Sequence, residues 1–143
     1  MTPPGEGSPA REYLAWVDEA RRALELAERD LENGPPRGDQ VGRGSGDPVL
    51  ARVLFDEDAL VRRAAARSVL DDARRRIGWL GSVHPEMAGV LELRHVRGLP
   101  WAEVAGELGV SEATARRWHR VMVDWVDSFG WSRARDGRGT AEG

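Results

Sequence analysis

The sequence contains no cysteine, which excludes disulfide bonds, thiolate metal ligands and a cysteine nucleophile. It also contains no lysine, so that all 21 of its basic residues are arginines. Arginine differs from lysine because its planar guanidinium can bind phosphate or guanine through two parallel hydrogen bonds. No apolar run reaches the length of a membrane-spanning helix, and the first residues do not have the pattern of a signal peptide. We therefore expect a cytoplasmic protein without disulfides.

Residue patterns typical of metal sites and catalytic sites are also absent from the sequence. The three histidines, His84, His95 and His119, are widely separated and do not form a metal-binding motif. Paired acidic residues occur at Glu57-Asp58 and Asp71-Asp72, but no further residues suggest a catalytic pocket around them. The sequence thus predicts no metal, no cofactor and no enzymatic activity.

The net charge of −3 is unevenly distributed along the chain. Residues 1–34 contain eight acidic residues and four arginines, whereas residues 62–76 contain six arginines and two acidic residues. These opposed charges favour packing of the two segments against each other, in a hairpin or across a dimer, over a second DNA-binding patch at 62–76. Residues 111–120 contain three arginines and one acidic residue, so a local basic face exists despite the negative total.

The spacing of apolar residues predicts a first amphipathic helix over residues 9–32. Apolar residues recur there at alternating intervals of four and three, which produces a seam like that of a coiled coil. Ser8 and Pro9 are typical of an N-cap and a first helical position. Residues 33–47 are rich in Gly, Pro and polar residues, and they predict a flexible linker.

A second long helix is predicted from Asp47-Pro48 to about residue 80. Aspartate is a common N-cap, and proline fits the first turn of a helix. An apolar stripe runs along the second half of this helix, at Leu70, Ala73, Ile77 and Leu80. The chain has no convincing strand and no internal repeat, so we predict an all-α fold whose long N-terminal helices form a hairpin or a coiled-coil-like pair.

Residues 101–120 have the pattern of a helix-turn-helix, the unit that places one helix in the major groove of DNA. Ala105 is small where two helices must approach closely, and Gly109 stands where the chain must turn with a positive φ. Ser111 is a typical N-cap for the following helix, which is predicted over residues 111–128. A further helix is expected before the motif, over residues 85–97.

The segments His84–Arg94 and Gly98–Ser111 resemble region 4 of the sigma-70 proteins. They share its helix ending in Leu-Arg, its short link, and its Glu-x-Ala-x-Glu-Leu-Gly stretch followed by serine. With Trp101 after the link and Trp118-His119 late in the second helix, the segment also resembles small phage-encoded late-gene regulators of the ArpU and RinA type. The resemblance covers residues 82–130 and implies promoter DNA and RNA polymerase as partners. No counterpart of the promoter-melting region 2 is recognised, so we do not expect a stand-alone sigma factor.

These patterns divide the chain into four parts. The predicted parts are a disordered N-terminus (1–8), an N-terminal helical module with its linker (9–80), a region 4-like DNA-binding domain (82–130) and a disordered tail (131–143).

The helix over 111–128 is predicted to contact DNA through one face. The candidate DNA-binding residues are Ser111, Glu112, Ala113, Thr114, Arg116, Arg117, His119 and Arg120. Ser111 and Thr114 would contact phosphates, and the arginines would face the groove, where Arg–guanine is the commonest specific pairing. Glu112 could accept a hydrogen bond from cytosine, or it could merely favour the helix N-terminus. His119 could contact phosphate or face the preceding helices.

The predicted function is therefore a sequence-specific DNA-binding transcriptional regulator encoded by a phage or prophage. Its expected partners are double-stranded DNA, RNA polymerase and a second copy bound through the N-terminal helices. Two alternatives remain open: a DNA-packaging protein like a small terminase subunit, and an adaptor that binds polymerase or a sigma factor without binding DNA.

Overall fold

The computed structural model describes residues 3–5, 7–35 and 47–140, the last three by their backbone alone. This part of the chain is built of helices without a strand, which confirms the all-α prediction. The elements are α1 (Ala10–Asn33), α2 (Pro48–Val83), α3 (Gly89–Leu91), the π-helical turn η1 (Glu92–Val96), α4 (Trp101–Leu108), α5 (Glu112–Phe129) and α6 (Trp131–Thr140). Most of the predicted linker, residues 36–46, lies outside the described residues.

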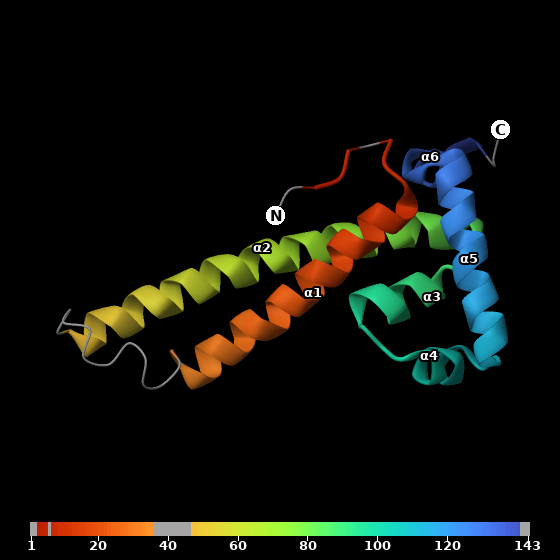
Figure 1. Ribbon diagram of the computed structural model, residues 1–143. Coiled ribbons are helices and arrows are strands. Elements are labelled where there is room, and N and C mark those ends of the chain that lie inside the picture. The colour runs from red at the N-terminus through yellow and green to blue at the C-terminus, as the bar shows by residue number, and fades with distance from the viewer. Residues whose placement is uncertain (1–2, 6, 36–46, 141–143) are drawn as a thin grey trace.

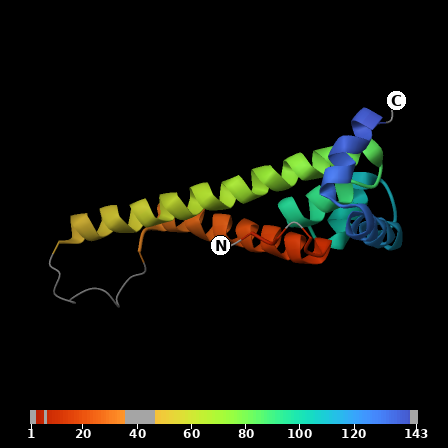
Figure 2. The same cartoon turned by 90° about the horizontal axis from the view of Figure 1, so that it is seen from above.

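α1 and α2 form a long antiparallel hairpin, and the remaining helices gather at one end of it as a head (Figures 1 and 2). Arginines of α2 form ion pairs with acidic residues of α1 in the same chain. Arg62 Nη2 lies 2.9 Å from Asp30 Oδ2, and Arg67 Nη2 lies 3.3 Å from Glu28 Oε2. The predicted hairpin is thus the arrangement found, and these arginines of α2 are engaged by the acidic helix α1.

The two hairpin helices begin in different ways. Asp47 caps α2 as predicted, since its Oδ1 accepts hydrogen bonds from the backbone N–H groups of Val49 and Leu50. The predicted cap of α1 by Ser8 is wrong, because Pro9 occupies the N-cap position and no neighbouring side chain caps the helix. The backbone N–H of Ala10 instead donates to Asp127 Oδ1 of α5, at 2.7 Å. A carboxylate distant in the sequence therefore replaces the local cap.

The helix predicted over residues 85–97 is shorter in the structure, where α3 begins at Gly89 and continues directly into the π-helical turn η1. In η1 the backbone N–H of Arg97 bonds to the carbonyl of Glu92, five residues back, which widens the helix. The chain then reverses at Gly98, whose φ is +69°. The left-handed backbone therefore favours glycine, and a Cβ at this position, 2.5 Å from Arg21 Nε, would also displace the Arg21 side chain.

Buried residues of the hairpin and of the head belong to one continuous core. The largest fully buried side chains are Leu80, Leu91, Met122, Val17, Val90, Val104 and Val123. None of the described helices is long and apolar enough to cross a membrane.

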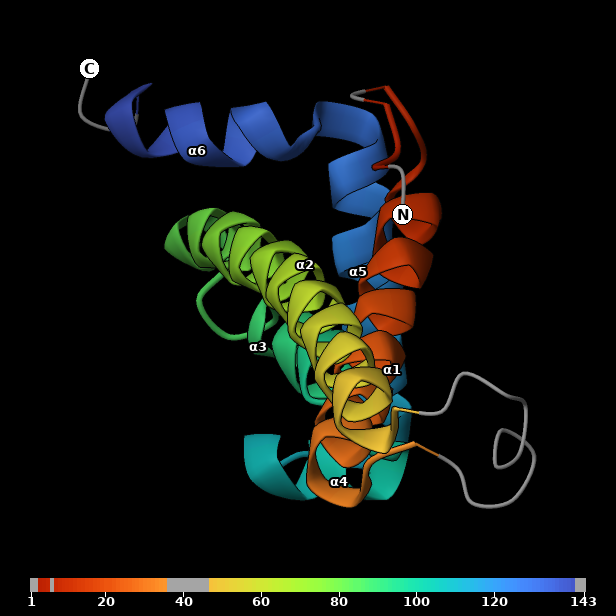
Figure 3. The ribbon, with the colours of Figure 1, turned by 90° about the vertical axis from the view of Figure 1, so that its left-hand side faces the viewer.

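The C-terminal segment predicted to be disordered forms the helix α6 up to Thr140. α6 lies across the end of α2 (Figure 3). Ala134 is fully buried there, and the ring of Trp131 packs 5.5 Å from that of Tyr13. These two apolar residues, one helical turn apart, supply contacts that offset the low helix propensity of Gly137 and Gly139. Residues 141–143 lie outside the described part of the chain.

Candidate nucleic-acid interface

A tight turn joins α4 to α5 and fixes the direction in which α5 leaves it. Gly109 ends α4 in the left-handed conformation, with φ +68° and ψ +33°, as the sequence predicts. The backbone N–H of Val110 bonds to the carbonyl of Ala105, which closes the end of α4. Ser111 then caps α5, because its Oγ accepts the hydrogen bond of the Thr114 backbone N–H at 3.1 Å. The local turn and cap predictions are therefore confirmed.

α5 has one buried face and one exposed face. Ala115, Met122, Val123 and Val126 are buried in the core, at the three- and four-residue intervals of an amphipathic helix. The opposite side exposes Ala113, Arg117 and Arg120 to solvent. The first half of this helix thus presents cations outward, while residues 115–126 anchor its other face in the core.

The three arginines of α5 differ in their surroundings. The guanidinium of Arg116 lies 5.1 Å from the ring centroid of Trp101 and 3.9 Å from Glu112 Oε1, so it is partly held by α4 and by its own helix. Arg117 and Arg120 are exposed and have no hydrogen-bond or ion-pair partner among the described residues. Their guanidinium groups can therefore bind an external anion or base without first breaking an internal contact.

The hydroxyl groups of Ser111 and Thr114, at the start of α5, are already hydrogen-bonded within the helix cap. Ser111 Oγ accepts from the Thr114 backbone and also donates to Thr114 Oγ1, at 3.0 Å. Ser111, Glu112 and Ala113 are exposed, and Thr114 is half-buried. Glu112 lies in the first helical turn, where a negative charge is favourable. The cluster can approach a backbone phosphate, but Glu112 opposes such an approach electrostatically.

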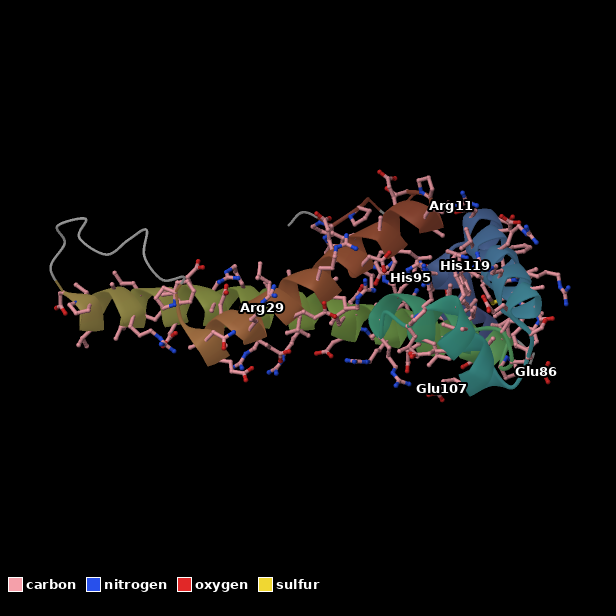
Figure 4. All side chains as sticks on the ribbon, turned by 60° about the horizontal axis from the view of Figure 1, so that its bottom comes forward. Arg11, Arg29, Glu86, His95, Glu107 and His119 are labelled. Carbon is pink, nitrogen blue, oxygen red and sulfur yellow. The ribbon has the colours of Figure 1, made fainter. Side chains whose placement is uncertain are left out.

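His119 does not share the exposed face of the arginines. Its Nε2 lies 2.8 Å from Nε2 of His95, and its ring stands perpendicular to that of Trp101 with 5.4 Å between centroids. Figure 4 labels both histidines in the head. Of the two orientations expected for His119, the structure has the inward one, so this residue does not lie with the exposed arginines.

His95 extends this contact to α1. Its Nδ1 lies 3.0 Å from Asp18 Oδ1, and its side chain is only 12% exposed. Arg21 Nη1 donates to the same carboxylate oxygen at 3.1 Å and to the carbonyl of His95 at 2.9 Å. The chain Asp18–His95–His119 therefore ties α5 to the hairpin through η1.

The pKa values of His119 and Asp18, at the two ends of this hydrogen-bonded series, are both lowered, although burial acts on them in opposite directions. Burial, together with the electrostatic effects of His95, Arg94 and Arg11, lowers the pKa of His119 to about 4. Burial alone would raise the pKa of Asp18, but its hydrogen bond and ion pair with His95 and those with Arg21 outweigh burial and lower it. His119 is consequently neutral and Asp18 ionised at pH 7.

Sequence reasoning missed Asp18, His95 and Arg21. Asp18 and His95 are 77 positions apart, and neither stands in a motif, so no local signal could have joined them. Among the described residues, no three His, Asp or Glu side chains form a group that could hold a metal ion. The contacts among Asp18, Arg21, His95 and His119 orient α5 and η1 relative to α1.

Comparisons with known proteins agree with the region 4 resemblance and extend it. The model of one protein family, described as ECF sigma factor, matches residues 21–128. The match begins inside α1 and ends in the last turn of α5, so it includes most of the hairpin as well as residues 82–128. No curated protein and no solved structure matches the chain.

Proposed function

This chain belongs to the ECF sigma factor family, and from that premise we propose that it is a sequence-specific regulator of transcription that reads double-stranded DNA with α5. In this proposal α4, the turn at Gly109 and α5 act as a helix-turn-helix, with α5 in the major groove. α1, α3, α4 and α6 pack on the other side of α5, and the exposed side of its first half would enter the groove.

The observation that carries the proposal is the pair of exposed, unengaged arginines on a helix whose other face is fixed in the core. Arg117 and Arg120 are three residues apart and therefore lie on one side of α5. Arginine pairs with the O6 and N7 atoms of guanine in the major groove, and it also binds phosphate. Ser111 and Thr114 would approach the phosphates flanking the contacted bases.

RNA polymerase is the second partner that we propose, on the strength of the family. Origin in a phage or prophage, and action in the bacterial cytoplasm, form part of the same proposal. Their support is the similarity of Trp101 and Trp118-His119 to phage late-gene regulators. We propose no catalytic role, since the contacts around α5 orient the helix and bring together no nucleophile and base.

Selection from a random double-stranded DNA library tests the proposal directly. The full chain is immobilised, bound DNA is amplified over several rounds, and the enriched pool is sequenced. We expect one recurrent motif, whose binding weakens steeply as salt is raised because arginines displace counterions from phosphates. Failure to enrich any motif, together with capture of purified RNA polymerase, would instead support an adaptor that does not read DNA.

A further inference from the structure

Trp101, the first residue of α4, contacts side chains from both neighbouring elements. The guanidinium of Arg94, in η1, lies 4.8 Å from the centroid of the Trp101 ring, and that of Arg116, in α5, lies 5.1 Å from it. The ring of His119 stands perpendicular to the indole, with 5.4 Å between centroids. The indole therefore lies where η1, α4 and α5 meet.

The neighbours of Trp101 are themselves held in place. Arg94 is half-buried, and its Nη1 donates a hydrogen bond to the carbonyl of Leu99 at 3.0 Å. His119 is held by His95, with 2.8 Å between their Nε2 atoms. The half-buried indole thus has fixed contacts on two sides, and it supports the more exposed guanidinium of Arg116.

The contact with Trp101 leaves the hydrogen-bond donors of Arg116 available. An indole attracts the charge of a guanidinium and does not occupy its N–H groups. The side chain of Arg116 is 58% exposed, and Glu112 Oε1 lies 3.9 Å from its Nη2, which is beyond hydrogen-bonding distance. Arg116 is therefore restricted in direction, while its planar fork of donors can still bind an external acceptor.

A supported arginine discriminates between bases better than a mobile one. Ordering a mobile arginine on binding is unfavourable, because the side chain loses rotamer freedom. Contact with Trp101 has removed part of this freedom from Arg116 before DNA arrives. A fork of fixed direction also pairs well only with a guanine whose O6 and N7 atoms lie opposite it. Arg117 and Arg120 have no such aromatic support among the described residues.

We propose that Arg116 is a specificity-determining residue that reads one guanine in the major groove, and that Trp101 is the residue that positions it. The inference rests on the proposed function, since it requires that α5 enters the groove. Arg116 precedes Arg120 by one helical turn, so the two guanidinium groups can reach the same groove. In this role Trp101 acts through Arg116 and needs no contact with DNA.

Binding to single-base variants of the selected motif tests the role of Arg116. The full chain is titrated with the motif and with duplexes in which each base pair is replaced in turn. Arg116→Lys retains the charge but lacks the planar fork, so discrimination at one G·C position should fall by about fivefold or more. Discrimination at the other positions and the salt dependence of the affinity should stay unchanged, because the number of cations is the same.

Substitution of Trp101 should affect the same position of the motif. Trp101→Leu should lower discrimination there by about two- to fivefold, the equivalent of one cation–π contact at an exposed site. Trp101→Phe keeps an aromatic face and should keep most of the discrimination. In the double variant with Arg116→Lys, Trp101→Leu should cause no further loss at that position, because the two residues act through one contact.

Trp79→Leu is the matched control for the loss of an indole. The guanidinium of Arg135 lies 5.5 Å from the centroid of the Trp79 ring, so this substitution removes a similar contact between α2 and α6. It should leave discrimination unchanged at every position of the motif. Far-UV circular dichroism verifies that each variant remains helical.

Two results would overturn the inference. Undiminished discrimination in Arg116→Lys would show that Arg116 reads no base, and equal losses at all positions in Trp101→Leu would show that Trp101 only supports the fold. Either result leaves the selected motif, and with it the proposed function, in place. Failure of the unsubstituted chain to select any motif would refute the proposed function and this inference together.

Discussion

His95 Nε2 and His119 Nε2 face each other at 2.8 Å, so that one proton at most can lie between the two rings. The other nitrogen of His95 contacts Asp18, which orients the ring from the hairpin side. A single hydrogen-bonded chain thus links α1 to the helix that we propose reads DNA. The direction of α5 relative to the hairpin depends on the hydrogen bonds of Asp18, His95 and His119 as well as on the apolar core.

Removal of the His119 imidazole should destabilise the fold. We expect His119→Ala to lower the free energy of unfolding by about 1–3 kcal/mol, because it leaves the buried ring of His95 without its partner. Urea unfolding followed by circular dichroism measures the change. Arg117→Ala is the matched control on the same helix, since an exposed substitution should stay within about 0.5 kcal/mol. Equal stabilities for the two variants would contradict a structural role for the histidine pair.

The histidine pair also predicts that stability depends on pH. The pKa of His119 is about 4 in the folded chain, below its ordinary value of 6.5. Between these values the unfolded chain binds more protons than the folded chain, so the free energy of unfolding rises with pH. The stabilisation is fully present above about pH 6.5 and is lost as the pH falls toward 4. Urea unfolding at a series of pH values should show this loss, and His119→Gln should flatten the profile. An unchanged slope in that variant would assign the titration to another group.

Gly98 should tolerate no side chain, whereas Gly106 should. Gly98→Ala requires a left-handed alanine and a Cβ 2.5 Å from Arg21 Nε, so we expect it to cost more than about 1 kcal/mol of stability. Gly106 lies within α4, and a Cβ there would meet no atom within 4 Å. Gly106→Ala should therefore be neutral or stabilising, by up to about 1 kcal/mol. Thermal unfolding compares the two variants, and similar melting temperatures would contradict the close approach of Arg21.

Asp127 should stabilise α1 from a distance. It accepts the hydrogen bond of the Ala10 backbone N–H at 2.7 Å, and Asp127→Ala should cost about 1 kcal/mol, as does the loss of other N-caps. Asp124→Ala, at an exposed position of the same helix, is the matched control. Amide hydrogen exchange should localise the loss of protection to the first turns of α1 in Asp127→Ala. Loss of protection confined to α5 would show that Asp127 acts within its own helix.

The local signals in the sequence predicted the parts of the fold that depend on near neighbours. Asp47-Pro48, Gly109 and Ser111 each act on the backbone within a few residues, so their types indicate a cap or a turn directly. Contacts between distant residues left no such signal. Asp127 caps a helix that begins 117 positions earlier, and no residue near Ala10 in the sequence indicates this hydrogen bond.

The same distinction applies to the candidate site. The exposed face of α5 followed from helical spacing and from the turn before it. The inward direction of His119 did not, because it depends on Asp18 and on the π-helical turn that carries His95. The helix α6 was missed because two apolar residues, Trp131 and Ala134, do not form a recognisable helical pattern in a segment rich in Gly and Arg.

The most direct test of the central claim is the affinity of α5 variants for the selected DNA. Fluorescence anisotropy at fixed salt should show that Arg117→Ala combined with Arg120→Ala weakens binding by at least about fivefold, which corresponds to the lower limit of about 1 kcal/mol for loss of one arginine–guanine contact. Arg22→Ala combined with Arg29→Ala removes the same charge from exposed positions of α1 (Arg29 is labelled in Figure 4) and should change the affinity little. Unchanged binding in the α5 variant, or equal losses in both, would contradict the proposal that α5 reads DNA.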